Sequence, residues 1–145
     1  MTETAPAPPI AAATPEERRT LLVSSLAVFA VFLDTTILFV AFPDITRSFP
    51  DVSPSDLSWV LNGYTIVFGA LLIPLGKYAD RRGHKAMFLW GSIVFTIGSL
   101  LCAVAPNPPA LIAARIVQAV GGAALVPSSL ALVLRSTPGP RIPIS

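Results

Sequence analysis

The chain has 145 residues, of which 53% are hydrophobic and only 12% are charged, with a mean hydropathy of +0.71. Soluble domains carry about 25% charged residues, so this composition excludes an ordinary water-soluble domain. The net charge of +2 and the isoelectric point near 9.1 would suit a nucleic-acid partner, but the basic residues lie in short segments between long apolar runs. That placement is typical of a membrane protein and indicates no nucleic-acid partner.

The first elements in chain order are an N-terminal tail and an apolar span. Residues 1–19 are rich in Pro, Ala, Thr and Glu and show no apolar periodicity, which predicts a disordered tail. The first apolar run covers about residues 20–42, follows Arg18 and Arg19, and ends before Pro43. It is longer than the apolar region of a signal peptide, and no small-residue cleavage site follows in a suitable place. We therefore expect a permanent membrane helix.

Three further apolar spans follow. The second is expected at about residues 57–75, after a polar loop in which Ser55 or Asp56 could cap the helix. The third is expected at about 86–104 and the fourth at about 110–134. Each span is long enough to cross a hydrocarbon core of about 30 Å, and in lipid the backbone must satisfy its own hydrogen bonds. The sequence therefore predicts an all-α membrane protein with four transmembrane helices.

Lysine and arginine are distributed unequally between the two sides of these spans. One side has only Arg47, and Arg115 lies within a span. The other side holds Arg18, Arg19, Lys77, Arg81, Arg82, Lys85, Arg135 and Arg141. Because positive charge is concentrated on the cytoplasmic side of membrane proteins, both termini are expected in the cytoplasm, including the short tail 135–145. The expected location is the plasma (inner) membrane, with a multi-pass topology.

Two charges lie within the predicted spans, Asp34 in the first and Arg115 in the fourth. A charge near the bilayer centre costs about 2.5–3.5 kcal/mol, so each requires a physical reason. Helix rise places both at a similar depth, and we predict that they face one cavity and interact, directly or through water. Gln118 and Gly122 fall on the same helix face as Arg115, and Asn62 could join this polar layer from the second span.

Two interpretations of the Asp34–Arg115 pair remain open from the residues alone. The first is an ion pair that only fixes how the helices pack. The second is an acid whose protonation is coupled to transport, because moving an arginine relative to a buried carboxylate changes the pKa of that carboxylate.

Three segments resemble motifs of one family. Gly76-Lys-Tyr-Ala-Asp-Arg-Arg-Gly-His-Lys85 resembles the signature between helices 2 and 3 of the major facilitator superfamily. Arg115-Ile-Val-Gln-Ala-Val-Gly-Gly-Ala-Ala124 is similar to its proton-coupling motif on helix 4. Leu33-Asp-Thr-Thr-Ile-Leu-Phe-Val-Ala-Phe-Pro43 is similar to the helix 1 motif of drug:proton antiporters, especially the fourteen-helix branch. The resemblance covers about residues 20–134, nearly the whole chain outside its tails.

The resemblance implies roles for the segment 76–85. Gly76 and Gly83 would permit a tight cytoplasmic turn, and Asp80 would lie at the start of the third membrane helix, where the helix dipole favours a carboxylate. In the family, the residues matching Asp80 and Arg81 latch onto the second helix bundle and stabilise the outward-facing state.

The resemblance also implies a function. Arg115 and Gln118 would take part in proton coupling, and Asp34 would belong to the acidic translocation site. The expected function is proton-coupled multidrug efflux, with the lipid bilayer, protons and a small amphipathic drug as partners. No cofactor is expected. An enzyme is not expected either, because the sequence shows no nucleophile–base pair and no cluster of metal ligands.

Some positions depart from the family pattern. Tyr78 stands where leucine is usual, and Phe39 stands where asparagine is common, so a polar substrate contact on the first helix is expected to be lost. His84 replaces a common arginine and is interpreted as a solvated loop residue. Cys102 is interpreted as a small packed apolar residue.

A major facilitator transporter has twelve or fourteen helices in two bundles, with the substrate bound between them. The four helices expected here would form part of the N-terminal bundle, so we expect a fragment that is inactive alone and lacks the second bundle. One alternative is a non-transporting membrane fragment that associates with a full-length relative. Another is a four-helix small multidrug transporter that works as a dimer.

Overall fold

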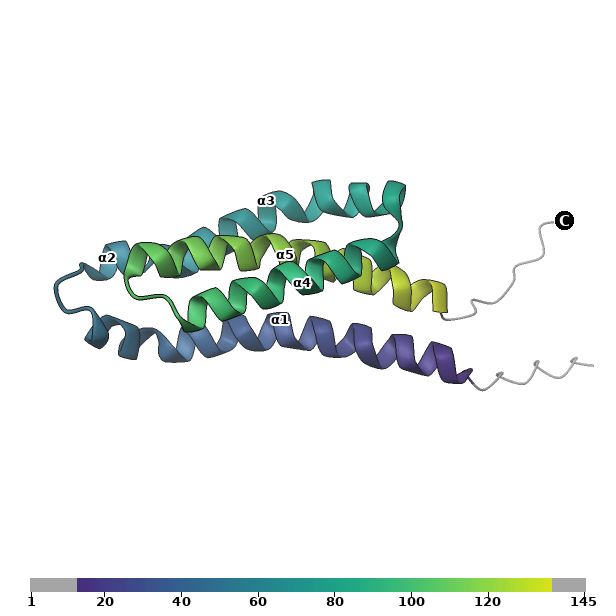
Figure 1. The fold of residues 1–145 in the computed structure, drawn as a ribbon, viewed down its shortest axis with the longest axis horizontal. Coiled ribbons are helices and arrows are strands. Elements are labelled where there is room, and N and C mark those ends of the chain that lie inside the picture. Colours follow the sequence, from purple (N-terminus) through teal and green to yellow (C-terminus); the bar gives the residue numbers. More distant parts are fainter. Residues whose placement is uncertain (1–12, 137–145) are drawn as a thin grey trace, which may run out of the picture.

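The computed structural model describes residues 13–136, and within this range every regular element is an α-helix. The helices are α1 (Pro15–Ser48), α2 (Pro54–Leu57), α3 (Trp59–Arg82), α4 (His84–Ala103) and α5 (Pro108–Ser136) (Figure 1). By length and composition, α1, α2 with α3, α4 and α5 give four helical segments able to cross a membrane. The predicted all-α fold with four membrane helices is confirmed. Most of the predicted N-terminal tail and the end of the C-terminal tail, residues 1–12 and 137–145, lie outside the described residues.

Helix α1 is longer than the predicted span at both ends. At its start, Thr14 and Glu17 form a capping box, in which each side chain bonds the other residue's backbone N–H, at 3.3 and 2.7 Å. The expected disorder of residues 15–19 is therefore wrong. At the other end the helix passes through Pro43 and ends at Ser48. After the proline, the Thr46 and Ser48 hydroxyls donate hydrogen bonds to the carbonyl oxygens of Phe42 and Asp44, each four residues earlier.

The segment 76–85 is not the loop that the sequence predicted. Helix α3 continues to Arg82 and α4 begins at His84, so Gly83 alone separates them. Gly83 has a φ of 100°, a conformation that glycine adopts without the strain other residues would meet. The start of the second span also differs. Ser53, instead of Ser55 or Asp56, is the cap, and its hydroxyl oxygen accepts a hydrogen bond from the Asp56 N–H at 3.1 Å.

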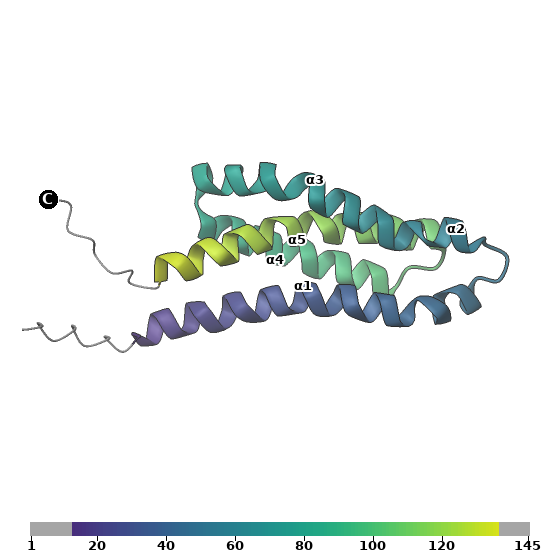
Figure 2. The same cartoon turned by 180° about the vertical axis from the view of Figure 1, so that it is seen from behind.

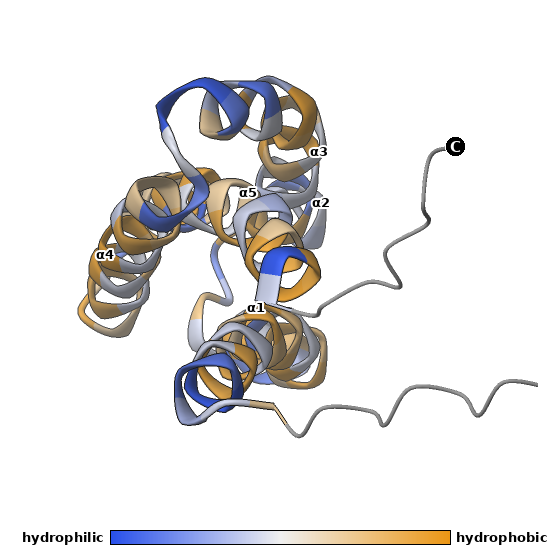
Figure 3. Ribbon diagram, turned by 90° about the vertical axis from the view of Figure 1, so that its right-hand side faces the viewer, coloured by the Kyte–Doolittle hydropathy of each residue, from blue (hydrophilic) through white to orange (hydrophobic). Residues whose placement is uncertain are grey.

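Helix α5 occupies the centre of the bundle. It packs against α4, α3 and α1, and it carries more buried residues than any other helix in the described range. Figure 1 and the reverse view in Figure 2 show α1 running along one side, with α3 on the opposite side. The end view in Figure 3 shows α5 between the other three long helices, whose outward faces are largely apolar. Lipid contact explains such exposure, for example of Phe29, Phe32 and Val40 on α1.

Small residues allow α4 and α5 to approach closely. A Cβ atom added to Gly98 would lie 2.7 Å from both N and Cα of Gln118. A Cβ added to Gly91 would lie 2.9 Å from the carbonyl oxygen of Gly121. These backbones are thus in contact at two levels, an arrangement that membrane helices achieve with glycine and alanine.

We predict that Gly98→Ala destabilises the bundle by about 1–3 kcal/mol, because its new methyl group would overlap the α5 backbone. The free energy of unfolding would be measured by denaturant titration of the purified chain in detergent micelles, followed by circular dichroism. Gly69→Ala is the matched control, since no atom lies within 4 Å of a Cβ added there. Equal stability of the two variants would contradict this packing.

Candidate functional site

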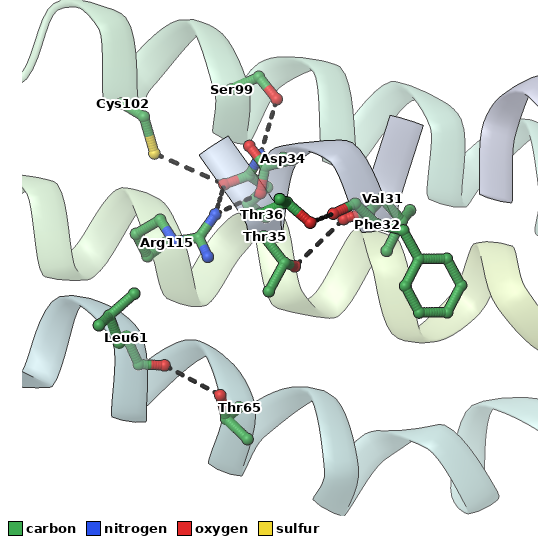
Figure 4. A network of polar contacts seen from close by, with 11 residues as sticks. Val31, Phe32, Asp34, Thr35, Thr36, Leu61, Thr65, Ser99, Cys102 and Arg115 are labelled. Carbon is green, nitrogen blue, oxygen red and sulfur yellow. Dashed lines mark hydrogen bonds and ion pairs between the residues drawn. The ribbon is translucent and has the colours of Figure 1, made fainter. Parts of the chain in front are cut away.

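An ion pair joins α1 to α5 inside the predicted membrane region. The Nη1 atom of Arg115 donates a hydrogen bond to Oδ2 of Asp34 at 2.5 Å. Arg115 is buried, whereas the Asp34 side chain is 27% exposed (Figure 4). The predicted interaction between these two charges is therefore confirmed, and it is direct.

Gln118 connects the two charged groups. Its Oε1 atom accepts a hydrogen bond from Arg115 Nη1 at 2.7 Å, and its Nε2 atom donates one to Asp34 Oδ1 at 2.7 Å. The side chain is fully buried. Because Gln118 lies three residues after Arg115 on α5, both face α1 and form one side of a closed polar triangle with Asp34.

Helix α4 contributes two residues whose role sequence reasoning missed. The Gln118 Nε2 atom also donates to the Ser99 hydroxyl at 2.9 Å, and the Cys102 Sγ atom lies 3.7 Å from Gln118 Oε1 as a weak donor (Figure 4). Ser99 and Cys102 are three residues apart, so they lie on the same helix face. This three-residue spacing is the sequence feature from which a shared polar face on α4 could have been predicted. A single glutamine amide thus joins α1, α4 and α5.

Helix α3 reaches the site through an aromatic ring. The Arg115 guanidinium lies over the Tyr64 ring, 4.0 Å from its centroid, so the ring face stabilises the charge. Tyr64 in turn stacks on Phe68. Gly122 leaves room for both rings, because a Cβ there would lie 3.3 Å from Tyr64 Oη and from a Phe68 ring carbon. The sequence led us to expect that Gly122 lines an open cavity. In the structure it packs against the aromatic side chains of Tyr64 and Phe68.

Asn62 does not belong to this polar layer. Its side chain is exposed, and its hydrogen bond is a long one of 3.4 Å to Ser58, one turn earlier. The expectation that it joins Asp34 and Arg115 is wrong, because the face of α3 turned to α5 at this level carries Gly63 and Tyr64 instead.

The segment 76–85 places its charged residues differently from the prediction. Asp80 lies in the last turn of α3, not at the start of the next membrane helix, so the dipole of α3 disfavours its charge. The carboxylate contacts His84, whose Nε2 atom lies 3.0 Å from Asp80 Oδ1. His84 is only 6% exposed, which corrects its interpretation as a solvated loop residue. Arg81 is exposed in the same turn.

The two glycines of this segment have different roles. Gly83 forms the predicted turn. Gly76 lies within α3, where a Cβ would be 3.6 Å from the Cβ of Pro127 on α5, so it permits helix packing and takes no part in the turn. Within residues 13–136, no group of three His, Cys, Asp or Glu side chains is placed to hold a metal ion.

The contacts of Asp34 link its charge to the packing of α1 against α5. Asp34 is the partly exposed member of the network, and both of its carboxylate oxygens accept hydrogen bonds from α5. Protonation of one oxygen would neutralise the carboxylate and weaken its attraction to Arg115. The contact between α1 and α5 would then change with the charge of one side chain.

Comparison with known proteins gives consistent results. The model of the family described as Major Facilitator Superfamily matches residues 24–143. The chain is 44% identical over 109 residues to a methylenomycin A resistance protein of Streptomyces coelicolor, covering 75% of this chain and 23% of that protein. It is 40% identical over 122 residues to the cephamycin export protein CmcT of Amycolatopsis lactamdurans, covering 83% and 25%. The drug efflux pump JefA of Mycobacterium tuberculosis is 33% identical over 129 residues, covering 89% and 25%. The chain spans about a quarter of the length of these relatives.

We predict that Gln118→Met lowers the free energy of unfolding by about 1–3 kcal/mol. Methionine has a similar volume but leaves donors and acceptors of the buried charges without partners. Denaturant titration in micelles would measure the loss. Asn62→Leu, which removes an exposed amide with one long hydrogen bond, should change stability by less than about 0.5 kcal/mol. A similar loss in both variants would mean that the network contributes no special stability.

Proposed function

Because the chain belongs to the major facilitator superfamily, we propose that it forms four membrane helices of the N-terminal bundle of a proton-coupled multidrug efflux transporter. Its relatives are named as an antibiotic resistance protein, an antibiotic export protein and a drug efflux pump, and these names support the proposal of drug efflux. The substrate class we propose is a small amphipathic molecule that is moved and not chemically altered, so no enzymatic reaction is involved. The family match also disfavours the four-helix small multidrug transporter as an alternative.

The observation that carries this proposal is the buried Asp34–Gln118–Arg115 network between α1 and α5. Arg115 and Gln118 are buried, whereas the Asp34 side chain is 27% exposed. A carboxylate that is partly accessible can exchange a proton while its two partners stay on α5. This unequal burial favours a pair that takes part in a transport cycle over a purely structural one.

We propose the following sequence of events at this site. Deprotonated Asp34 holds Arg115 through the ion pair and through Gln118. A proton arriving at Asp34 neutralises it, weakens the pair, and lets α1 move relative to α5. Release of that proton on the other side of the membrane restores the pair. Proton flow is thereby linked to a change in helix packing.

The membrane orientation is part of the proposal. Both termini and the Gly83 turn would face the cytoplasm, and the membrane would be the plasma (inner) membrane. The exposed Asp80 and Arg81 side chains would then be available to latch onto helices of a second bundle. Asp80 is 70% exposed although it contacts His84, which leaves part of its carboxylate accessible to such a partner.

We predict that Asp34→Asn reduces proton-driven efflux at least about tenfold, because the side chain can no longer gain or lose a proton. The test uses a chimaera in which this chain replaces the matching segment of the Streptomyces coelicolor methylenomycin A resistance protein. Efflux of methylenomycin A driven by a pH gradient would be measured in inverted vesicles. Asp44→Asn is the matched control, since Asp44 lies on the same helix but is exposed and pairs with the exposed Arg47.

Unchanged efflux by the Asp34→Asn chimaera would remove Asp34 from the mechanism. The purified chain, tested alone in proteoliposomes, distinguishes the alternatives. Proton-driven transport by this chain would show that a second bundle is not required. Co-purification with a full-length relative in the absence of transport would favour a non-transporting fragment.

A further inference from the structure

A cavity lies at the corner where α3 ends and α4 begins. Its volume is about 640 Å³. From α3 it is lined by Leu75, Tyr78 and Arg82, and from α4 by Ala86, Met87 and Trp90. None of these residues takes part in the Asp34 network, so the cavity is separate from the proposed transport site.

The cavity has a charged end and an apolar end. Arg82 lies one residue before the Gly83 turn, and its guanidinium is 5.6 Å from the centroid of the Tyr78 ring. Leu75 lies seven residues earlier on α3, or about 10 Å deeper along the helix. Met87 and Trp90 lie in the first two turns of α4. Because the turn joins two helices that are long and apolar enough to cross a membrane, we place the charged end at the membrane–water interface and the apolar end toward the hydrocarbon.

The positive charge of Arg82 is not matched by an ion pair in the part of the chain that the structure describes. Among residues 13–136, Arg82 forms no ion pair, and its recorded side-chain contact is with the Tyr78 ring. The nearest carboxylate in sequence, that of Asp80, contacts His84 and does not line the cavity. Lys77 and Arg81, on the same turns of α3, add positive charge near the Gly83 turn, although they do not line the cavity. The mouth of the cavity therefore attracts an anion.

We propose that this cavity binds a phospholipid with an anionic headgroup. The phosphate accepts hydrogen bonds from Arg82, and an acyl chain lies along Leu75, Met87 and Trp90. Tyr78 and Trp90 are 47% and 45% exposed, as expected for aromatic rings that contact lipid at the interface. Basic pockets between membrane helices are recognised binding sites for anionic headgroups.

A second groove provides an internal comparison. It lies between α1, α4 and α5, has a volume of about 520 Å³, and is also lined by cations, Arg19 and Lys85. Glu16, however, lines the same groove and would repel a lipid phosphate. Anionic lipid should therefore prefer the Arg82 cavity.

The test uses the purified full chain in detergent, with dioleoyl phosphatidylglycerol or dioleoyl phosphatidylcholine added and retained lipid counted by native mass spectrometry. The wild-type chain should retain phosphatidylglycerol in preference to phosphatidylcholine. Arg82→Gln should weaken phosphatidylglycerol binding about fivefold, whereas Arg82→Lys, which keeps the charge, should lose less than twofold. Arg19→Gln, in the second groove, should have no effect. Circular dichroism checks that each variant keeps its helical content.

Three results would overturn the proposal. One is unchanged phosphatidylglycerol retention in Arg82→Gln. Another is an equal loss in Arg19→Gln, which would indicate general attraction to the basic side of the protein. The third is displacement of the lipid by millimolar glycerol 1-phosphate, which would show a site for a soluble phosphate that needs no acyl chain.

Discussion

The contact between the backbones of α4 and α5 determines where the polar residues of this bundle can meet. Gly98 has no side chain, so α4 lies directly against the backbone of Gln118. At that separation the short side chain of Ser99 reaches the Gln118 amide. Were the helices separated by an ordinary side chain, the amide would lose its α4 partner in a medium that offers no water in its place.

The network also shows how a membrane protein can hold two charges with few polar residues. Asp34 and Arg115 neutralise each other, and one amide supplies both a donor and acceptor that complete the arrangement. The Tyr64 ring stabilises the guanidinium from the remaining side without adding a further charge. Each of the four long helices thus contributes to a single site, which makes its geometry sensitive to any shift between them.

The sequence was most informative where helix geometry alone decides the outcome. The depth of Asp34 and Arg115 follows from the helical rise per residue. Because an unpaired charge within the membrane is costly, two opposite charges at one depth are expected to pair. The position of Gln118 on the same face as Arg115 was predicted from helical spacing. Ser99, Tyr64 and the true environment of Gly122 could not be predicted, because they depend on how each helix is rotated about its axis, and apolar runs facing lipid carry little information about that rotation.

The segment 76–85 was misinterpreted for a different reason. Its charges marked the end of the apolar span, and that end was taken as the end of the helix. Lysine, arginine and alanine are good helix formers, so α3 continues past the apolar span until Gly83 ends it. The extension brings Asp80 beside His84 and buries a residue that composition alone would place in water.

The single-residue link at Gly83 has a mechanical consequence. A connection with only one non-helical residue has very few free dihedral angles, so the adjoining ends of α3 and α4 cannot slide or separate independently. If movement of α5 displaced α4 through the Ser99–Gln118 hydrogen bond, the adjoining end of α3 would therefore move as well. Asp80 lies three residues before Gly83, so movement of α4 at the buried amide would reach Asp80 through this short link.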